Sequence, residues 1–447
     1  MTTPALQPDK GSGPPKSVKT RTVQGAGWTV AGYGIQQILR LGSNLITTRL
    51  LAPDAFGLMA MVFVFITGLE MLSDVGVGPA IIQSKHGDDR RLLDTAWTVQ
   101  VIRGFLLLAL CVMLGWPVAR LYAEPRLTAL LAVAGVGIAI RGFTPTRVHS
   151  LNRQVLLGRL TAMELLSQAM SIVVTIASAW LLRSVWALLI GVIFGDVARV
   201  SLSYLMLPGH RHRLRLDREA VGELVRVGRW IFFSTAVSYA AGNLDRLTMG
   251  RLVSIRELGV YTIAFQIAGA ALHVGRAVSS RVLFPVLAET LRTSPERLYQ
   301  RLLKARTAYL LPTVLGSLAL AVWGDVLIRV LYRPEFHEAG WMLRIMGAGC
   351  VVAAVNQSAG VLWPALGEFR TITLLMLLQV PVLLAAMFVG HALFGTVGFV
   401  VGLCIPELVI LPVQSLLTSR RRLWQPELDL PVLVVSALVI AIGAIAR

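Results

Sequence analysis

The sequence predicts an all-α polytopic membrane protein, made of two six-helix lobes that are parallel repeats, with an additional C-terminal helix. Three observations predict this class. Of the 447 residues, 55% are hydrophobic and only 15% are charged, and the mean hydropathy is +0.69. Apolar segments long enough to cross a bilayer recur from Trp28 to the end of the chain. Finally, two stretches that lie 202 residues apart resemble each other.

The apolar segments can be placed individually, because a crossing helix needs about 20 predominantly apolar residues. Thirteen segments meet this requirement. In chain order they lie near 25–51, 55–83, 92–117, 127–148, 160–182, 184–207, 226–252, 257–288, 306–332, 339–364, 370–393, 395–418 and 430–446. With thirteen crossings the C-terminus lies outside; the alternative is that the last segment does not span.

The charges of the connecting loops predict the orientation and the domain boundaries. Alternate loops carry roughly three times as many Lys and Arg residues as the others, which places them and the N-terminus in the cytoplasm. This asymmetry accounts for most of the net charge of +18 without a nucleic-acid partner. The predicted parts are a disordered basic tail (1–22), two lobes (23–207 and 226–418), a basic cytoplasmic linker (208–225), and a basic loop with the additional transmembrane helix (419–447).

The internal repeat relates the beginnings of the two lobes. Without a gap, Gly27–Leu58 aligns with Arg229–Val260, so that Trp28 matches Trp230, Arg49 matches Arg251 and Gly57 matches Gly259. Six segments separate the copies, so both run in the same direction. Parallel repeats of this kind bind substrate between the halves and expose it to each side in turn.

Polar residues form a face on the first segment of each lobe. In the first segment the residues at helical spacing, with their neighbours, are Gln36, Gln37, Arg40, Ser43, Asn44, Thr47 and Thr48. In the seventh segment they are Tyr239, Asn243, Arg246 and Gly250, with Asp245 to one side. Polar groups at this depth face protein or a water-filled cavity and not lipid.

Further intramembrane charges have both a functional and a structural interpretation. The functional candidates are Gln100 with Arg103, His273 with Arg276 and Ser280, and the carboxylates Glu70 and Glu407 as coupling groups. For each of them, and for Asp245 with Arg246, the alternative is a hydrogen bond or ion pair between neighbouring helices. We expect Asp196 and Arg199 to neutralise each other within one helix, and Asp74 to cap or anchor a helix end.

The cationic groups indicate an anionic ligand. Guanidinium groups bind phosphate in a bidentate manner, so a lipid diphosphate fits better than a cationic drug. The predicted binding residues are Gln36, Arg40, Asn44, Arg103, Asn243, Asp245, Arg246 and Arg276, with Asp245 holding Arg246 or responding to cations. The chain contains no Walker loop and no HExxH motif, and Cys111, Cys350 and Cys404 lack metal-ligand spacing. We therefore expect no catalytic residue, metal or cofactor.

Several stretches resemble the polysaccharide transporter (oligosaccharide flippase) family of the multidrug/oligosaccharidyl-lipid/polysaccharide exporter superfamily. They are "GWTVAGYGIQQILRLGSNLITTRLLAPDAFGLMAMV", "LSDVGVGPAIIQ", "GNLDRLTMGRLVSIRELGVYTIAFQI" and "LFPVLAE". The likeness extends from about Val23 to Ser419, and its motifs are diffuse. It implies a V-shaped pair of lobes that flips undecaprenyl-diphosphate-linked oligosaccharide across a bacterial inner membrane, for capsule, exopolysaccharide or lipopolysaccharide synthesis. Polysaccharide polymerase and other envelope-synthesis proteins would be partners, besides membrane lipids. The thirteenth segment departs from the twelve or fourteen that are common in this pattern.

Three other functions are alternatives to flipping. A cation-coupled multidrug exporter of the same architecture would have a cavity dominated by acidic and aromatic groups. A membrane polysaccharide polymerase or ligase would have a large outer loop, and every predicted loop is short. A scaffold for envelope synthesis would not explain the duplication.

Overall fold

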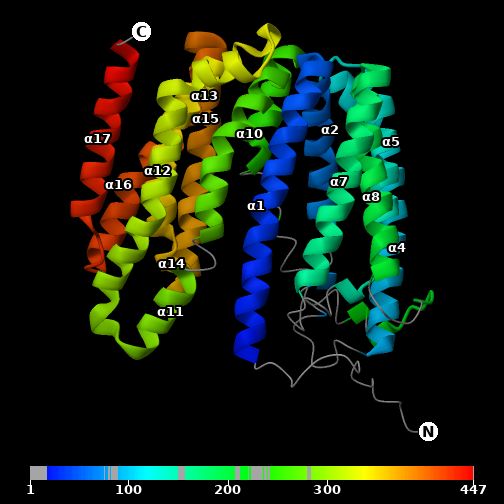
Figure 1. Cartoon of the computed structure of the whole chain (residues 1–447), viewed down its shortest axis with the longest axis horizontal. Helices are drawn as coiled ribbons and strands as arrows, with labels where there is room; N and C mark the ends of the chain where they lie inside the picture. The colour runs from blue at the N-terminus through cyan, green and yellow to red at the C-terminus, as the bar shows by residue number, and fades with distance from the viewer. Residues whose placement is uncertain are drawn as a thin grey trace.

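The computed structural model describes residues 18–74, 76–78, 81, 89–148, 157–206, 212–219, 221–222, 235, 239, 242–278 and 283–445. In this part of the chain the regular structure is helical throughout, as the apolar segments predicted. Figure 1 shows long helices that stand side by side and run between two ends of the molecule. We call the end at which α1 begins the basic end, because α4, α12 and the α16–α17 turn bring arginines there, and the other the opposite end.

The helices of the N-terminal half correspond to the first six predicted segments. They are α1 (Val18–Leu50), α2 (Pro53–Leu72), α4 (Arg90–Leu121), α5 (Arg126–Gly142), α7 (Leu157–Leu182) and α8 (Val185–Met206). The closest packing pairs α4 with α5 and α7 with α8, and α1 packs on α7. Gly191 and Gly195 of α8 face Thr175 and Ser171 of α7 without room for a Cβ atom, which explains the GxxxG spacing at this point.

The helices of the C-terminal half begin with a helical stretch at 242–252. The remaining helices are α10 (Ile255–Val278), α11 (Phe284–Thr293), α12 (Leu298–Leu331), α13 (Ala339–Gly360), α14 (Leu362–Ala365), α15 (Phe369–Gly402), α16 (Ile405–Arg420) and α17 (Pro426–Ile445). Short 3₁₀ turns at Pro295–Arg297 and Pro334–Phe336 precede α12 and α13.

Helix α15 contains the chain reversal that the sequence placed between its eleventh and twelfth segments. The backbone leaves the helical region at Phe394 and Gly395, where Gly395 has a φ of 58°. After this kink Gly398 passes so close to Gly390 that a Cβ atom on it would lie 1.9 Å from the Gly390 carbonyl oxygen. Only glycine allows this backbone contact, so the pair of glycines fixes how tightly the two arms pack.

The two halves meet along α2 and α10, which form the most extensive contact between them. At their crossing Gly57 and Gly259 face each other. A Cβ atom on Gly57 would lie 2.0 Å from the carbonyl oxygen of Ile255, and one on Gly259 would lie 1.9 Å from that of Pro53. These two glycines are equivalent positions of the 202-residue repeat. The two copies of the repeat therefore contact each other through the same residue.

Additional contacts close the opposite end of the molecule around this crossing. The Phe56 and Phe336 rings meet edge to face with centroids 5.7 Å apart. The Tyr122 hydroxyl donates to the Leu247 carbonyl at 3.2 Å. Deeper in the molecule the Tyr239 hydroxyl donates to the Val64 carbonyl at 2.8 Å. The halves are therefore joined by backbone packing and by hydrogen bonds at several levels.

Helix α17 is docked on the C-terminal half by a buried ion pair. The Arg306 guanidinium of α12, which is 2% exposed, contacts Asp429 of α17 at 2.5 Å. It also donates to Ser358 Oγ at 3.1 Å and to Gln425 Oε1 at 3.2 Å. The loop charges predicted from the sequence include Arg306, and this prediction was wrong because Arg306 lies inside the helix packing.

The linker between the halves is also docked. Its residues 212–217 run along the beginning of α4, where the His212 ring stacks on Trp97 with centroids 5.7 Å apart and contacts Asp94 at 3.3 Å. Backbone N–H groups of the linker donate to side chains of α4: Arg213 to Asp94, Arg215 to Thr98 and Asp217 to Thr95. This segment is bound to the N-terminal half in a defined register.

Seven helices in the described part are long and apolar enough to cross a membrane by length and composition. They are Pro53–Leu72, Arg90–Leu121, Gly158–Leu182, Val185–Met206, Leu298–Leu331, Ala339–Ala365 and Arg370–Gly402. The chain is accordingly an all-helical, multi-span membrane protein.

Candidate functional site

The polar face of α1 is buried near Asn44 and becomes exposed closer to the basic end. Asn44 is 8% exposed, and its side-chain amide donates to Gln266 of α10 at 3.3 Å, which joins the two halves. Arg40 lies one turn nearer the basic end on the same face and is exposed. Gln36, a further turn along, is half-buried, and its carbonyl accepts from Gln168 at 3.1 Å. Among the described residues, Asn44 is therefore where this face is hydrogen-bonded to the other half.

Arg40 is a cation without a compensating partner in the part of the chain that the structure describes. Its guanidinium makes no hydrogen bond or ion pair there, whereas most other arginines at membrane depth are engaged. A charge held at mid-helix in a spanning segment is costly unless it reaches water, an ion or a ligand. Exposed Arg40 is therefore free to contact water, an ion or a ligand beside α1.

Arg246 lies close to the same contact on the other half. Its guanidinium donates to Asn243 Oδ1 at 3.3 Å and lies over the Phe265 ring, 4.4 Å from the centroid. Phe265 directly precedes Gln266, the partner of Asn44, in α10. By the 202-residue offset Arg246 is also the repeat equivalent of Asn44. Arg246 thus lies against the residue next to Gln266 in sequence, and the prediction that these polar groups form one binding site stays a prediction.

Asp245 has a different partner from the predicted one. It is 5% exposed and accepts a hydrogen bond from the Tyr261 hydroxyl at 2.5 Å. Its Oδ1 atom is buried without a hydrogen-bond partner among the described residues, and no ion pair joins it to Arg246. The prediction that Asp245 holds Arg246 was wrong, because adjacent helical residues point about 100° apart and these two face different neighbours.

A second charged cluster lies inside the N-terminal half. Arg141 of α5 contacts Glu70 of α2 at 2.9 Å and Asp196 of α8 at 2.6 Å. Arg199 contacts Glu164 of α7 at 3.5 Å. The expectation that Asp196 and Arg199 neutralise each other was therefore wrong. Arg141 was missed in the sequence, where its only signal was a basic residue at the end of an apolar segment.

Arg103 belongs to this cluster and not to the contact between the halves. It donates to Ser73 Oγ at 2.9 Å and to the Glu70 carbonyl. Together with Gln100 and Arg141 it lines a cavity of about 250 Å³ between helices of the N-terminal half. Its place inside one half removes Arg103 from the set that faces α10.

Glu407 lines a larger cavity within the C-terminal half. This cavity has a volume of about 690 Å³ and lies between α12, α13, α14, α15 and α16. Asn356 donates to one Glu407 oxygen at 2.7 Å, and Gln379 donates to the other at 3.3 Å. The aromatic side chains of Tyr309 and Trp363 complete the lining.

The side chains of Arg276 and His273 lie outside the described residues, although both belong to helix α10. Ser280, predicted on the same face, is not described at all. Their predicted part in the site stays a prediction.

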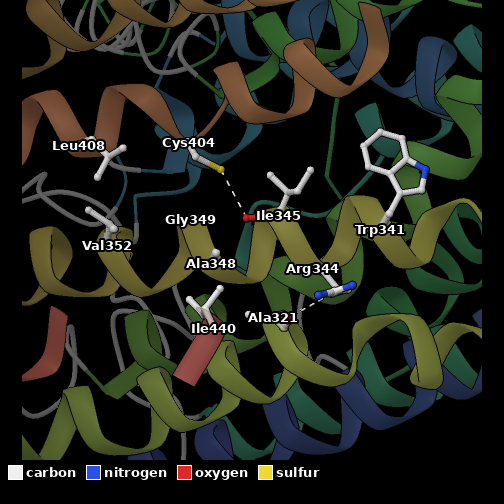
Figure 2. Close-up of a pocket in the computed structure, with 10 residues that line it drawn as sticks. All are labelled: Ala321, Trp341, Arg344, Ile345, Ala348, Gly349, Val352, Cys404, Leu408 and Ile440. Atoms are coloured by element: carbon white, nitrogen blue, oxygen red, sulfur yellow. Dashed lines mark hydrogen bonds between the residues drawn. The ribbon is translucent and has the colours of Figure 1, made fainter. Parts of the chain in front are cut away.

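A further cavity, shown in Figure 2, has a volume of about 460 Å³ and a nearly apolar lining from α12, α13, α16 and α17. Its charged residue, Arg344, donates to the Ala321 carbonyl at 3.3 Å and contacts Asp325 at 3.7 Å. The Cys404 thiol points to the Ile345 carbonyl at 3.7 Å. Within the described ranges no cluster of three or more metal-ligating side chains occurs.

The family follows from comparison with known proteins. Residues 46–340, well over half of the chain, match the family described as "Polysaccharide biosynthesis protein". The chain belongs to this family. As a member, it is a transmembrane transporter of polysaccharide biosynthesis in the MOP superfamily and not an enzyme, as the sequence predicted.

Two curated relatives are similar over much of their length. The "Lipopolysaccharide biosynthesis protein WzxC" of Escherichia coli (strain K12) is 21% identical over 436 residues, which is 94% of this chain and 88% of the relative. The "Succinoglycan biosynthesis transport protein ExoT" of Rhizobium meliloti (strain 1021) is 22% identical over 333 residues, or 74% of this chain and 66% of the relative.

Two solved structures share the fold. The structure titled "Lipid II flippase MurJ, inward closed conformation" has a TM-score of 0.74 at 10% identity, covering 93% of this chain and 91% of that one. An inward-facing multidrug resistance MATE family transporter of the MOP superfamily has a TM-score of 0.62 at 14% identity, covering 93% and 98%. At these identities the likeness concerns the fold alone.

Proposed function

We propose that this family member is a flippase that moves undecaprenyl-diphosphate-linked oligosaccharide from the cytoplasmic to the periplasmic leaflet of a bacterial inner membrane. The product would serve exopolysaccharide, capsule or lipopolysaccharide synthesis. Membership of the family and the names of the WzxC and ExoT relatives support this proposal. In this account the basic end and the N-terminus are cytoplasmic, and polysaccharide polymerase or other envelope-synthesis proteins are partners.

The observation that carries the proposal is the polar face of α1. Exposed Arg40 lies one turn below the Asn44–Gln266 contact, and Arg246 lies on the opposing half beside Phe265. Guanidinium groups bind diphosphate oxygens in a bidentate manner, and amide groups such as those of Gln36 and Asn243 pair with sugar hydroxyls. In the proposal these groups line a water-accessible passage beside α1 and α10, where they bind the diphosphate and the first sugars, and Arg276 joins them from α10.

The proposed mechanism is alternating access of two lobes, 23–207 and 226–418, around a pseudo-twofold axis along the membrane normal. The contact between the repeat-equivalent residues Gly57 and Gly259 supports this symmetry. A second pair supports it as well, because Tyr122 ends α4 and Tyr332 ends α12. In the proposed division the linker (208–225) joins the lobes, and the loop and helix of 419–447 follow them, with α17 as the thirteenth crossing. The predicted boundary of the tail (1–22) falls within α1, which begins at Val18.

The contacts near Gly57 and Gly259 make the present arrangement closed at the opposite end. Substrate would enter the passage at the basic end, and rocking of the lobes would break the α2–α10 contact and form a new one near the cytoplasm. Glu70 and Glu407 are the proposed coupling carboxylates. Each lies within one half, where a change in its protonation or ion binding would alter the packing of that half.

Multidrug export is the second candidate, and one observation favours it. The cavity beside Glu407 combines a carboxylate with Tyr309 and Trp363, which is chemistry that suits an organic cation. The passage beside α1, however, carries uncompensated positive charge at Arg40, which repels such a substrate.

The deciding experiment reconstitutes the full chain in liposomes with two substrates. One is a fluorescent undecaprenyl-diphosphate oligosaccharide placed in one leaflet, and the other is a fluorescent cationic drug. We expect protein-dependent movement of the lipid and no drug uptake. Drug uptake driven by an ion gradient, without lipid movement, would replace the flippase proposal with the export candidate.

A further inference from the structure

Helices α16 and α17 enclose a groove that opens toward the bilayer at the basic end. Its volume is about 410 Å³, and its apolar walls include Leu411, Leu416, Leu430 and Leu433. Leu416 is 56% exposed and Leu430 is 53% exposed, so the groove is open on its outer side. Ser419, Trp424 and Asp429 line its end near the turn between the helices, and the Asp429 carboxylate is paired with Arg306.

Three consecutive arginines form the turn that closes this groove. The N–H groups of Arg421 and Arg422 donate to the Thr418 and Ser419 carbonyls, and Arg422 adopts a φ of 57° at the end of α16. All three arginines, Arg420 included, are exposed. The turn therefore places three exposed arginines in the chain between Ser419 and Trp424, which both line the groove.

The charge at this turn is only partly balanced by the protein. Three carboxylates at this end each have a partner: Glu368 contacts Arg421, Asp429 contacts Arg306 and Glu427 accepts from the Tyr299 hydroxyl. Arg420 and Arg422 have no ion-pair partner among the residues that the structure describes. Two positive charges thus remain available to a ligand.

The groove is also a fixed surface. The buried Arg306–Asp429 ion pair holds the beginning of α17 against α12, and Gln425 adds a hydrogen bond to the same guanidinium. The groove extends from Ser419 to Leu411, about 12 Å along α16 at 1.5 Å per residue. The groove therefore matches a phospholipid in two respects. Its apolar walls suit an acyl chain, and the unpaired arginines and the tryptophan beside them suit a phosphate headgroup at the membrane surface.

We infer that the α16–α17 groove binds an anionic phospholipid, with its phosphate at Arg420 and Arg422 and an acyl chain between Leu416 and Leu430. Basic sites between helices on the cytoplasmic side of a membrane attract acidic lipids, with about 1 kcal/mol for each Lys or Arg near the surface. A zwitterionic lipid gains less, because its own cation opposes the two arginines. The inference does not depend on the transported substrate.

The test is native mass spectrometry of the delipidated full chain, titrated with phosphatidylglycerol or phosphatidylcholine. We expect tighter binding of phosphatidylglycerol, and a loss of roughly 25-fold in its apparent affinity in the double variant Arg420→Ala/Arg422→Ala. The matched control is Arg292→Ala/Arg297→Ala, which removes two exposed arginines at the same end away from the groove. Leu430→Trp, which fills the groove and keeps the arginines, should weaken binding of the same lipid.

Two results would overturn the inference. One is equal binding of the two lipids by the wild-type protein. The other is an equal loss of affinity in the groove variant and in the control variant, which would show attraction to the surface charge in general.

Discussion

Replacing Gly57 with alanine should weaken the contact that closes the opposite end. The added Cβ atom would lie 2.0 Å from the Ile255 carbonyl oxygen and 3.1 Å from the Gly259 nitrogen, and both are backbone atoms that cannot rotate away. To reach an ordinary contact of 3.4 Å, α2 and α10 must separate by about 1.4 Å. Overpacking of this kind costs about 1–3 kcal/mol, which shifts a two-state equilibrium about 5- to 150-fold toward the arrangement without the contact.

The assay is electron–electron distance measurement between spin labels at Leu182 and Glu338, which are exposed at the opposite end of the two halves. Gly57→Ala should add a population with longer distances, while the wild type keeps the shorter one. Gly34→Ala is the matched control, because Gly34 is also helical and its added Cβ atom would meet nothing within 4 Å. An unchanged distance distribution in Gly57→Ala, in a folded protein, would refute the reasoning that this backbone contact closes the molecule.

Three further predictions concern ion pairs and hydrogen bonds elsewhere in the molecule. Arg306→Met should lower the free energy of unfolding by about 3–5 kcal/mol, because it leaves the buried Asp429 carboxylate without its partner. Arg306→Met/Asp429→Leu should recover most of this loss. Denaturant titration in detergent measures both variants, and an equal loss in the two would contradict the ion-pair explanation. Asp94→Ala removes the acceptor for His212 and for the Arg213 N–H, so trypsin should cut the linker about tenfold faster, while Asp89→Ala, at the start of the same helix, should leave the rate unchanged. The hydrogen bond from Arg126 holds the pKa of Glu124 below its usual value of 4.5. It therefore contributes stability that is present above pH 4.5 and is lost as the pH falls through the lowered pKa. In that range the Tm of the wild type should fall more than the Tm of Glu124→Gln, and parallel curves of Tm against pH would exclude the effect.

The sequence predicted the helices and the repeat well, because both depend on local regularities. The length and hydropathy of the segments located the crossing helices, and the 202-residue offset identified Gly57 and Gly259, which pack against each other. The polar face of α1 also followed from spacing alone, since residues at i and i+4 share one side of a helix.

The charge pairs could not be predicted, because spacing shows which face a residue occupies but not which helix lies opposite. Asp196 pairs with Arg141, 55 residues away, and not with Arg199 on its own helix. Asp245 binds Tyr261 and not its neighbour Arg246. Arg306 looked like a loop cation until α17, more than 100 residues further along, supplied Asp429. Ion pairs between distant segments depend on the packing of whole helices.

The most direct test of the account is the flipping rate of Arg40→Gln in liposomes with undecaprenyl-diphosphate oligosaccharide. A charge-assisted hydrogen bond contributes about 1.5–3 kcal/mol, so the rate should fall at least about tenfold, and Arg40→Lys should restore part of it. Arg120→Gln, which removes an exposed arginine that lies over Trp116 at the opposite end, should flip at the wild-type rate. A wild-type rate in Arg40→Gln would contradict the claim that this face of α1 binds the diphosphate.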